Sequence, residues 1–135
     1  MRCFVADELL VFSQSKRGGF KDTRPEEILS AVLKAVYTKV GLDPALIGDI
    51  QVGNVLPPGG GATAARMASL HAGIPYTVPI STVNRQCSSS LTAISAIANQ
   101  IVAGQIDIGI GASYTICFEI SLTEALDIQV LVSSR

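Results

Sequence analysis

The amino-acid sequence predicts an α/β fold, on the evidence of three features of its 135 residues. Stretches rich in β-branched residues alternate with stretches whose apolar residues recur at helical spacing, a pattern typical of βαβ units with parallel neighbouring strands. The helical stretches end at glycines, which readily adopt the left-handed conformation that stops a helix. Apolar residues make up 48% of the chain and charged residues 16%, so the chain can bury a core and is not expected to be disordered.

The first strand and the first helix are expected within residues 1–41. The apolar run at residues 9–12 predicts a short strand. A helix is expected to begin at Thr23, which can cap it, with Pro25 in its first turn and Glu26 completing a capping box. An apolar stripe follows, and Gly41 ends it; the stripe is Ile28, Leu29, Val32, Leu33, Val36 and Val40.

The rest of the chain continues the alternation. Strands are expected at residues 49–55, 78–84 and 107–111. An alanine-rich helix is expected at residues 62–72, closed by Gly73. A further helix is expected at residues 88–103, ended by Gly104, with Leu91, Ile94, Ile97, Ala98 and Ile101 on one face. Residues 112–135 show no clear period and stay unassigned.

Charge and hydropathy exclude several classes of function. The chain has 10 basic and 11 acidic residues, which leaves no electrostatic footprint for nucleic acid or an anionic membrane. The uncharged stretch 86–106 is long enough to span a bilayer, but it is rich in Ser, Thr, Asn and Gln and has no aromatic belt, so we expect a buried helix. An acidic pair near the N-terminus argues against a secretory signal, and three cysteines suit a reducing compartment. We therefore expect a soluble intracellular protein without a membrane span.

Cys87 is the residue of greatest chemical interest, because it stands between a predicted strand and the first turn of a predicted helix. Free N–H groups and the positive end of the helix dipole converge there, and both favour an anion. A thiolate in this place is a usable nucleophile, and backbone N–H groups of the turn could form an oxyanion hole for a carbonyl under attack. The alternative is a buried structural cysteine, since free Cys is among the most buried residue types.

Cys87 has no evident catalytic partner in the sequence. His71 is the only histidine, and it stands near the end of the predicted helix 62–72. A histidine there more often interacts with the helix dipole than acts as a base, so a structural role is expected. No His, Cys, Asp and Glu cluster has the spacing of metal ligands, and no metal is expected.

Two features could contact a phosphate. Gly59, Gly60 and Gly61 precede a helix, whose exposed N–H groups can hold an anion, but the segment lacks the ending of a P-loop and the spacing of a dinucleotide fingerprint. Lys16 and Arg17 lie in a predicted loop, where two basic residues are usually solvated. A plain turn and a solvated loop are the favoured interpretations, and a small phosphate-binding module is the alternative.

Four segments together resemble the N-terminal part of the thiolases, in particular the degradative 3-ketoacyl-CoA thiolases of peroxisomes. The segments are residues 17–23 (Arg-Gly-Gly-Phe-Lys-Asp-Thr), 53–56 (Gly-Asn-Val-Leu), 83–89 (Val-Asn-Arg-Gln-Cys-Ser-Ser) and 107–110 (Asp-Ile-Gly-Ile). The resemblance covers residues 16–111, and the segment around Cys87 is its most specific part. It implies a thiolase-like N-terminal domain, residues 1–135, with a mixed, mostly parallel sheet and helices on its faces.

The resemblance implies an acyl-CoA C-acyltransferase of fatty acid β-oxidation. In the family, the cysteine that matches Cys87 attacks a 3-ketoacyl-CoA, acetyl-CoA leaves, and a second CoA removes the acyl group as a shortened acyl-CoA. CoA and acyl-CoA are substrates, and no cofactor is implied. The activating His, the acid/base Cys and the Asn-containing water site lie in a C-terminal half that these 135 residues do not include. A catalytically incomplete thiolase-like fragment is therefore the alternative.

The resemblance also implies a partner and a compartment. Family members pair as homodimers through the strand before the nucleophile, here residues 78–84, and a peroxisomal location is implied, with the cytoplasm or mitochondrion as alternatives. The chain departs from the family pattern at Ser90, where the family has Gly, at residues 9–12 and after Gly111.

Overall fold

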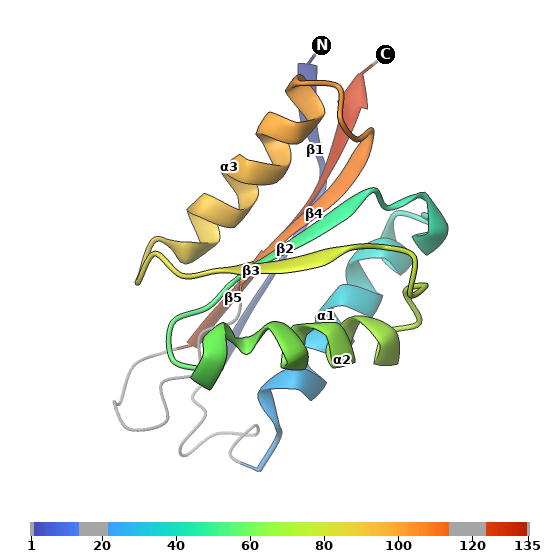
Figure 1. The fold of residues 1–135 in the computed structure, drawn as a ribbon. Helices are drawn as coiled ribbons and strands as arrows, with labels where there is room; N and C mark the ends of the chain where they lie inside the picture. The colour runs from blue at the N-terminus through green and yellow to red at the C-terminus, as the bar shows by residue number, and fades with distance from the viewer. Residues whose placement is uncertain (1, 14–21, 114–123, 135) are drawn as a thin grey trace.

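A five-stranded β-sheet organises the chain in the computed structural model, which describes residues 2–13, 22–113 and 124–134 (Figure 1). The strands lie in the order β1-β5-β4-β2-β3, with bounds β1 (Arg2–Ser13), β2 (Asp49–Gly53), β3 (Ile80–Val83), β4 (Ile108–Ser113) and β5 (Glu124–Ser134). The helices are α1 (Pro25–Lys39), α2 (Ala62–His71) and α3 (Ser89–Val102), with short 3₁₀ turns η1 (Pro44–Leu46) and η2 (Pro58–Gly61).

Within this sheet, four strands run in one direction and β5 runs in the other. β2 pairs in parallel with both β3 and β4. β5 pairs antiparallel with β4 and with β1, so β1 runs parallel to β4. The α/β class with a mixed, mostly parallel sheet is thus confirmed.

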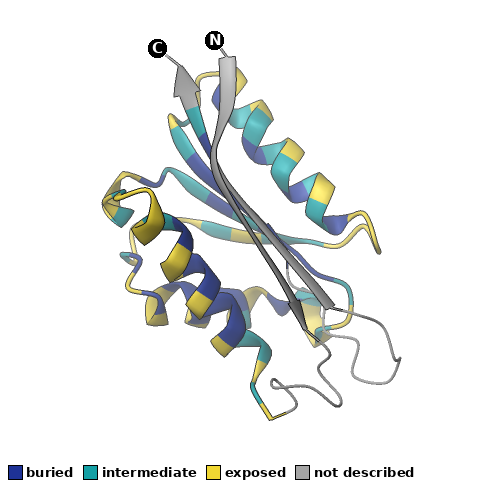
Figure 2. Ribbon diagram, turned by 180° about the vertical axis from the view of Figure 1, so that it is seen from behind, coloured by how far each residue is buried: buried dark blue, intermediate teal, exposed yellow. Residues whose placement is uncertain are grey.

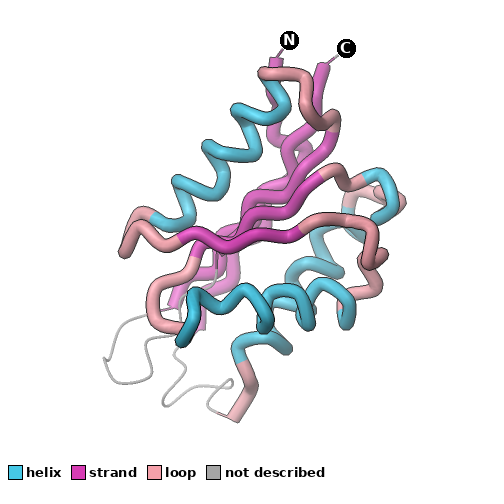
Figure 3. Tube along the Cα trace, in the orientation of Figure 1, coloured by secondary structure: helices cyan, strands magenta, loops and turns pink. Residues whose placement is uncertain are grey.

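Helices cover both faces of the sheet, giving three layers (Figure 3). α1 and α2 pack together on one face, and α3 lies on the other. The larger core lies under α1 and α2 and takes in the inward side chains of β2 and β4, among them Leu29, Leu33, Ile50, Val52 and Ile110. The smaller core joins Ile97 and Ile101 of α3 to Leu131 of β5. Figure 2 shows the buried residues on the sheet-facing sides of these helices.

Glycines let α3 lie unusually close to the sheet. A Cβ on Gly53 would stand 2.5 Å from the carbonyl carbon of Ser89, and one on Gly109 would stand 2.6 Å from Ile97 Cγ2. At Gly111 it would stand 2.8 Å from Ile94 Cα. Glycines in strands often mark such a close backbone approach. The first turn of α3 therefore rests directly on the end of β2.

The start of α1 lies one residue later than the sequence predicts. Arg24, not Thr23, is the N-cap, and its backbone N–H donates to the Glu27 carboxylate over 3.4 Å, a contact expected from Glu26. Pro25 occupies the first helical position, where its missing N–H costs no hydrogen bond. The apolar stripe is confirmed except at Val40, which is exposed at the C-cap. Gly41 follows with a φ of 64°, the predicted stop.

The predicted inward face of α3 is wrong at one residue. Leu91 is 64% exposed, and the buried positions are Ser89, Ala93, Ile97 and Ile101. At 3.6 residues per turn, Leu91 lies about 120° round the helix from Ile97, outside the contact with the sheet. Ile94 and Ala98 pack against the edge of the buried stripe.

The remaining elements match the predictions with shifts at their ends. The strands expected at 49–55 and 78–84 are shorter, as β2 and β3, while residues 9–12 form part of a longer β1. α2 ends before Gly73, which has a φ of 87°, and α3 ends before Gly104, which has a φ of 74°. Part of the unassigned stretch 112–135 forms β5.

Candidate active site

Cys87 lies in the short turn that joins β3 to α3, and its side chain is exposed. β3 ends at Val83 and α3 begins at Ser89, so the thiol stands just beyond the carboxyl end of a parallel strand. In open α/β sheets, ligands bind in the crevice outside the carboxyl ends of the strands. The turn therefore presents the thiol, and the interpretation of Cys87 as a buried structural cysteine is wrong.

The residue before Cys87 has an unusual backbone conformation. Gln86 has a φ of 51°, the one non-glycine residue with positive φ in the described chain. A non-glycine residue in this region is uncommon and persists when its surroundings hold it there. Asn84 is one such support, because its Oδ1 accepts a hydrogen bond of 3.0 Å from the Gln86 N–H. The turn that carries Cys87 is thus a defined conformation.

The Ser89 hydroxyl ties the two ends of this turn together. Ser89 is 2% exposed, and its Oγ accepts a hydrogen bond of 2.8 Å from the Arg85 N–H. The same Oγ lies 2.7 Å from the Gln86 carbonyl oxygen and 3.0 Å from that of Asn54, to either of which it can donate its hydrogen. The hydroxyl therefore bridges the residues before Cys87, the start of α3 and the segment after β2.

Asn54 is a buried residue that supports the turn from below. Its side chain is fully buried, and its Nδ2 donates to the Gly60 carbonyl oxygen over 2.6 Å. Its backbone N–H donates to the Val83 carbonyl oxygen over 3.0 Å, which links it to the end of β3. A second contact joins the same two loops, because Asn84 Nδ2 donates to the Val55 carbonyl oxygen over 3.0 Å. These bonds hold the η2 loop, the end of β3 and the start of α3 as one unit.

Some backbone groups predicted for an oxyanion hole are already engaged. The N–H groups of Ser88 and Ser89 donate to the carbonyl oxygens of Arg85 and Gln86, both over 3.1 Å. These two donors therefore stabilise the turn itself. An oxyanion role for the backbone around Cys87 stays a prediction.

His71 occupies a structural position. It ends α2, on the sheet face opposite to α3, and its Nδ1 lies 2.8 Å from the hydroxyl of the buried Ser30 on α1. The bond links the two helices that cover the larger core. The geometry agrees with the structural role expected from the sequence, and it does not bring His71 beside Cys87.

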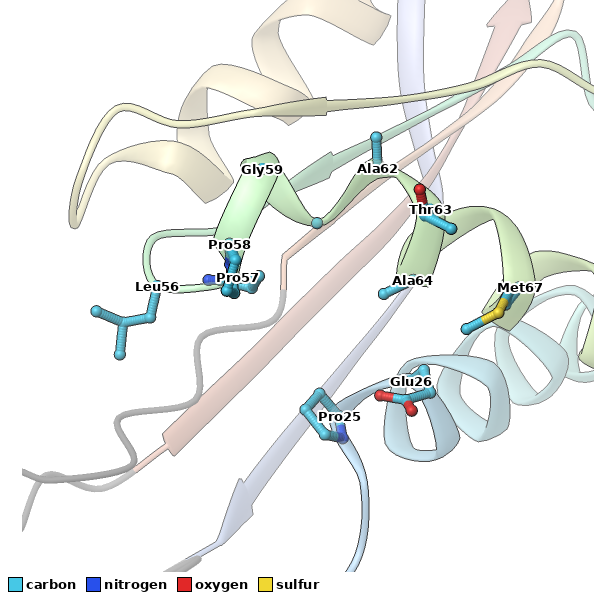
Figure 4. A pocket seen from close by; sticks show the side chains of 11 residues that line it. Pro25, Glu26, Leu56, Pro57, Pro58, Gly59, Ala62, Thr63, Ala64 and Met67 are labelled. Carbon is cyan, nitrogen blue, oxygen red and sulfur yellow. The ribbon is translucent and has the colours of Figure 1, made fainter.

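The three consecutive glycines form a left-handed turn beside an apolar groove. Gly59, Gly60 and Gly61 have φ values of 64°, 72° and 68°, and the carbonyl of Gly60 is bound by Asn54. The groove has a volume of about 600 Å³ and lies between η2 and the first turns of α1 and α2 (Figure 4). Leu56, Pro57 and Met67 are among its lining residues, and Cys87 is not. The glycines thus allow the left-handed backbone of a turn whose Gly60 carbonyl oxygen binds the buried Asn54 side chain.

The other residues considered from the sequence are not part of the turn that carries Cys87. Lys16, Arg17 and Cys117 lie outside the described residues, and Cys3 lies in β1, where side chains are not described. Within the described part of the chain, no group of three or more His, Cys, Asp and Glu side chains could hold a metal ion. In the same residues, no helix has both the length and the apolar character needed to cross a membrane.

Two residues important for the turn are missed by sequence reasoning. The sequence pattern places Ser89 in the first turn of a helix and Asn54 in a strand, and both lie in segments that carry the family resemblance, but no role is predicted for either. The available signal is the Gly-Asn pair at positions 53 and 54, since a glycine in a strand indicates that another backbone passes close by.

The comparisons with known proteins agree with the fold and with the family resemblance of the sequence. A family model described as the thiolase N-terminal domain matches residues 5–113. The chain is 59% identical over 96 residues to 3-ketoacyl-CoA thiolase A, peroxisomal, of Mus musculus, a match that covers 71% of this chain and 23% of that protein. The chain therefore spans less than a quarter of the length of this curated relative.

Two solved structures match a larger share of this chain at a lower identity. The peroxisomal 3-ketoacyl-CoA thiolase of Saccharomyces cerevisiae, described as a five-layered structure built from two core domains of identical topology, matches with a TM-score of 0.79 and 37% identity. The match covers 84% of this chain and 34% of that chain. A structure described as the dimeric peroxisomal thiolase of the same yeast matches with a TM-score of 0.78 and 37% identity over 84% of this chain and 30% of that one.

Proposed function

The chain belongs to the thiolase family, matching its N-terminal domain over residues 5–113, and from this premise we propose that Cys87 is the nucleophile of a thiolytic acyl transfer. The proposed substrate is a 3-ketoacyl-CoA, in keeping with the name of the mouse relative. The observation that carries the proposal is the exposed Cys87 thiol at the end of β3, on a turn held by buried hydrogen bonds.

The proposed reaction has two half-reactions. The Cys87 thiolate adds to the 3-keto carbon, and the bond between that carbon and C2 breaks with its electron pair moving to the acetyl-CoA fragment. A proton donor then completes acetyl-CoA, which leaves the acyl group on sulfur as a thioester. In the second half-reaction the thiolate of a free CoA attacks this thioester, forms the shortened acyl-CoA and releases the Cys87 thiolate.

This chain supplies the nucleophile and its support. Thiolate attack requires an exposed sulfur in a fixed position, and the Asn84, Ser89 and Asn54 hydrogen bonds restrain the backbone on both sides of Cys87. The proton transfers need a base, and His71 is engaged with Ser30 on the opposite face of the sheet. We infer that the base comes from outside residues 22–113.

The runner-up is a thiolase-like fragment without complete catalysis. It is favoured by the open setting of Cys87, which lines neither the groove beside η2 nor the smaller hollow of about 270 Å³ beside His71. The outer face of α3 also lacks any charged residue and exposes Leu91 and Val102. The yeast structure is described as five layers built from two core domains, one layer fewer than two separate three-layer units would make. One helical layer is therefore shared between the domains, and the uncharged outer face of α3 fits a place in such a layer.

A second copy of the chain is the proposed partner. β3 lies at the edge of the sheet, and an edge strand presents unpaired backbone groups to another chain. The similar yeast structure is described as dimeric. We place the dimer contact at β3, beside the turn that carries Cys87.

The proposed compartment is the peroxisome. The mouse relative and both yeast structures carry that location in their descriptions. The cytoplasm and the mitochondrion are the alternatives, and fluorescence microscopy of the tagged chain beside a peroxisomal marker distinguishes the three.

Release of acetyl-CoA tests the function. The chain is mixed with a molar excess of a 3-ketoacyl-CoA in the absence of free CoA, and acetyl-CoA is quantified by chromatography. We expect release of up to one equivalent per chain, and none from Cys87→Ser. Release that persists in Cys87→Ser would overturn the assignment of Cys87, and no release from either protein would favour the incomplete fragment.

A further inference from the structure

The Ser89 hydroxyl is placed to act on the Cys87 turn from beneath. Ser89 is 2% exposed, so water cannot replace its partners freely. Its Oγ has three hydrogen-bonding neighbours within 3.0 Å, and all three are backbone groups. A buried hydroxyl with this many partners does more than begin a helix, and Ser88, not Ser89, is the N-cap.

The contacts of Ser89 connect backbone groups on both sides of Cys87 in the sequence. Two partners, Arg85 and Gln86, come directly before Cys87, and Ser89 comes two residues after it. The hydroxyl therefore closes a ring through the backbone of residues 85–89. Gln86, the residue with positive φ, lies within this ring.

The third neighbour of the hydroxyl, the Asn54 carbonyl oxygen, is an alternative acceptor to that of Gln86, and a bond to it links the ring to the sheet. The Asn54 carbonyl oxygen lies 3.0 Å from Ser89 Oγ, and Asn54 is itself fixed to β3 and to η2. Gly53 permits this contact, because a Cβ there would stand 2.5 Å from Ser89. Movement of the Ser89 hydroxyl would thus remove this link between the turn and the sheet.

We propose that Ser89 is a positioning residue that holds the Cys87 thiol in the direction required for acyl transfer. The inference rests on the proposed function of Cys87 and adds a role that acts through the backbone, without contact between Ser89 and the substrate. Geometry of this kind strongly affects rate, since a displacement of about 1 Å in a reacting group can cost roughly 100-fold.

The test uses four variants of the full chain. Ser89→Ala removes the hydroxyl. Ser89→Thr and Ser89→Val have nearly the same shape and differ in the hydroxyl, so their comparison isolates the hydrogen bonds from packing even where Ser89→Ala fails to fold. Ser88→Ala is the matched control, because the neighbouring Ser88 is exposed and its side chain makes no capping bond.

Three readouts are measured on each variant. Hydrogen exchange of the Arg85 amide reports the bond to Ser89. The rate of Cys87 acylation by a 3-ketoacyl-CoA reports positioning. The rate of Cys87 alkylation by iodoacetamide, a small reagent with little demand on geometry, reports whether the thiol is present and accessible.

We expect Ser89→Ala and Ser89→Val to raise Arg85 exchange and to lower acylation at least ~10-fold, while alkylation stays within about 2-fold. Ser89→Thr is expected to stay near the unmodified chain, and Ser88→Ala to match it. Equal acylation of Ser89→Thr and Ser89→Val would overturn the positioning role while leaving the proposed function intact. Absence of acylation in the unmodified chain would instead overturn the proposed function, and the inference with it.

Discussion

The hydroxyl of Ser89 lies 3.0 Å from the main-chain oxygen of Asn54, a residue 35 positions earlier in the chain. This contact joins the helix that follows Cys87 to the loop that follows β2. Asn54 in turn is bound to Val83 at the end of β3 and to Gly60 in η2. The exposed thiol thus stands on a turn that this network links to the sheet.

Replacing Gly53 with Ala is expected to weaken both the fold and the site. The new Cβ would stand 2.5–2.8 Å from the backbone of Ser89 and Ser90, atoms that a side-chain rotation cannot move. We expect a loss of about 1–3 kcal/mol in the free energy of unfolding, measured by urea denaturation, as for an overpacked core. Acylation of Cys87 should fall with it, because the first turn of α3 must shift.

Gly41→Ala is the matched control for Gly53→Ala. Gly41 has a φ of 64°, and a Cβ added there would meet no atom within 4 Å, so the cost of the substitution comes from backbone conformation alone. That cost is about 1–2 kcal/mol, comparable with the expected loss at Gly53. Acylation should be unchanged in folded Gly41→Ala. Equal effects of the two variants on acylation would contradict a specific role for Gly53.

Substitutions at Gln86 are expected to follow its positive φ of 51°. Gly adopts this conformation without steric cost, whereas a β-branched residue is a strong outlier there. We therefore expect the unfolding free energy of Gln86→Gly to equal or exceed that of the unmodified chain. That of Gln86→Val should be lower, and the differences should be on the order of 1 kcal/mol. A Gln86→Val protein as stable as Gln86→Gly would show that the turn does not keep this conformation in solution.

Removal of His71 is expected to affect stability and not the thiol. His71→Ala leaves the buried Ser30 hydroxyl without its partner, at a cost of about 1–3 kcal/mol in the free energy of unfolding. The rate of Cys87 acylation should be unchanged where the variant is folded. Ser30→Ala in the same background should recover part of the lost stability, because it removes the unpaired group. Loss of acylation in His71→Ala with the fold retained would contradict a purely structural role for His71.

The free edge of β3 is expected to hold the dimer together. The Ile50 N–H donates to the Pro79 carbonyl oxygen and the Asn54 N–H donates to that of Val83. Because backbone groups alternate in direction along a strand, the backbone polar groups of the odd-numbered residues in 79–83 point toward β2, and those of Thr82 point toward the free edge. Thr82→Pro removes an outward N–H and is tolerated on an edge strand. Light scattering at micromolar concentration should show self-association of the unmodified chain and the 14.1 kDa monomer for Thr82→Pro.

Ser81→Pro provides the contrast for the edge variant. Its N–H faces β2 by the same alternation, so this substitution should destabilise the sheet itself. A monodisperse monomer of the unmodified chain would contradict the assignment of β3 as a contact surface.

The sequence predicts those parts of the fold that depend on local patterns. The stripe from Ile28 to Val36 and the stops at Gly41, Gly73 and Gly104 follow from helical spacing and from the left-handed freedom of glycine, and all are confirmed. β5 is missed because its segment has no internal period, and its pairing with β1 and β4 joins distant parts of the chain. Leu91 is misassigned because an apolar residue near a stripe resembles a member of it.

The position of Cys87 can be predicted from the sequence, but the hydrogen-bond network beneath it cannot. Cys87 is identified from its place between a strand and a helix, which is local information. The network beneath it joins residues 53–54, 60 and 83–89, and no local pattern places these segments together. Thr23 and Glu26 show the same limit at smaller scale, since the cap of α1 lies one residue later, at Arg24 and Glu27.

The most direct test of Cys87 as the nucleophile is peptide mass spectrometry after incubation of the folded chain with a 3-ketoacyl-CoA. We expect an acyl thioester on Cys87, with Cys3 and Cys117 unmodified in the same sample as internal controls. No adduct on Cys87, or equal labelling of the three cysteines, would contradict the claim that the turn between β3 and α3 makes Cys87 a selective acyl acceptor.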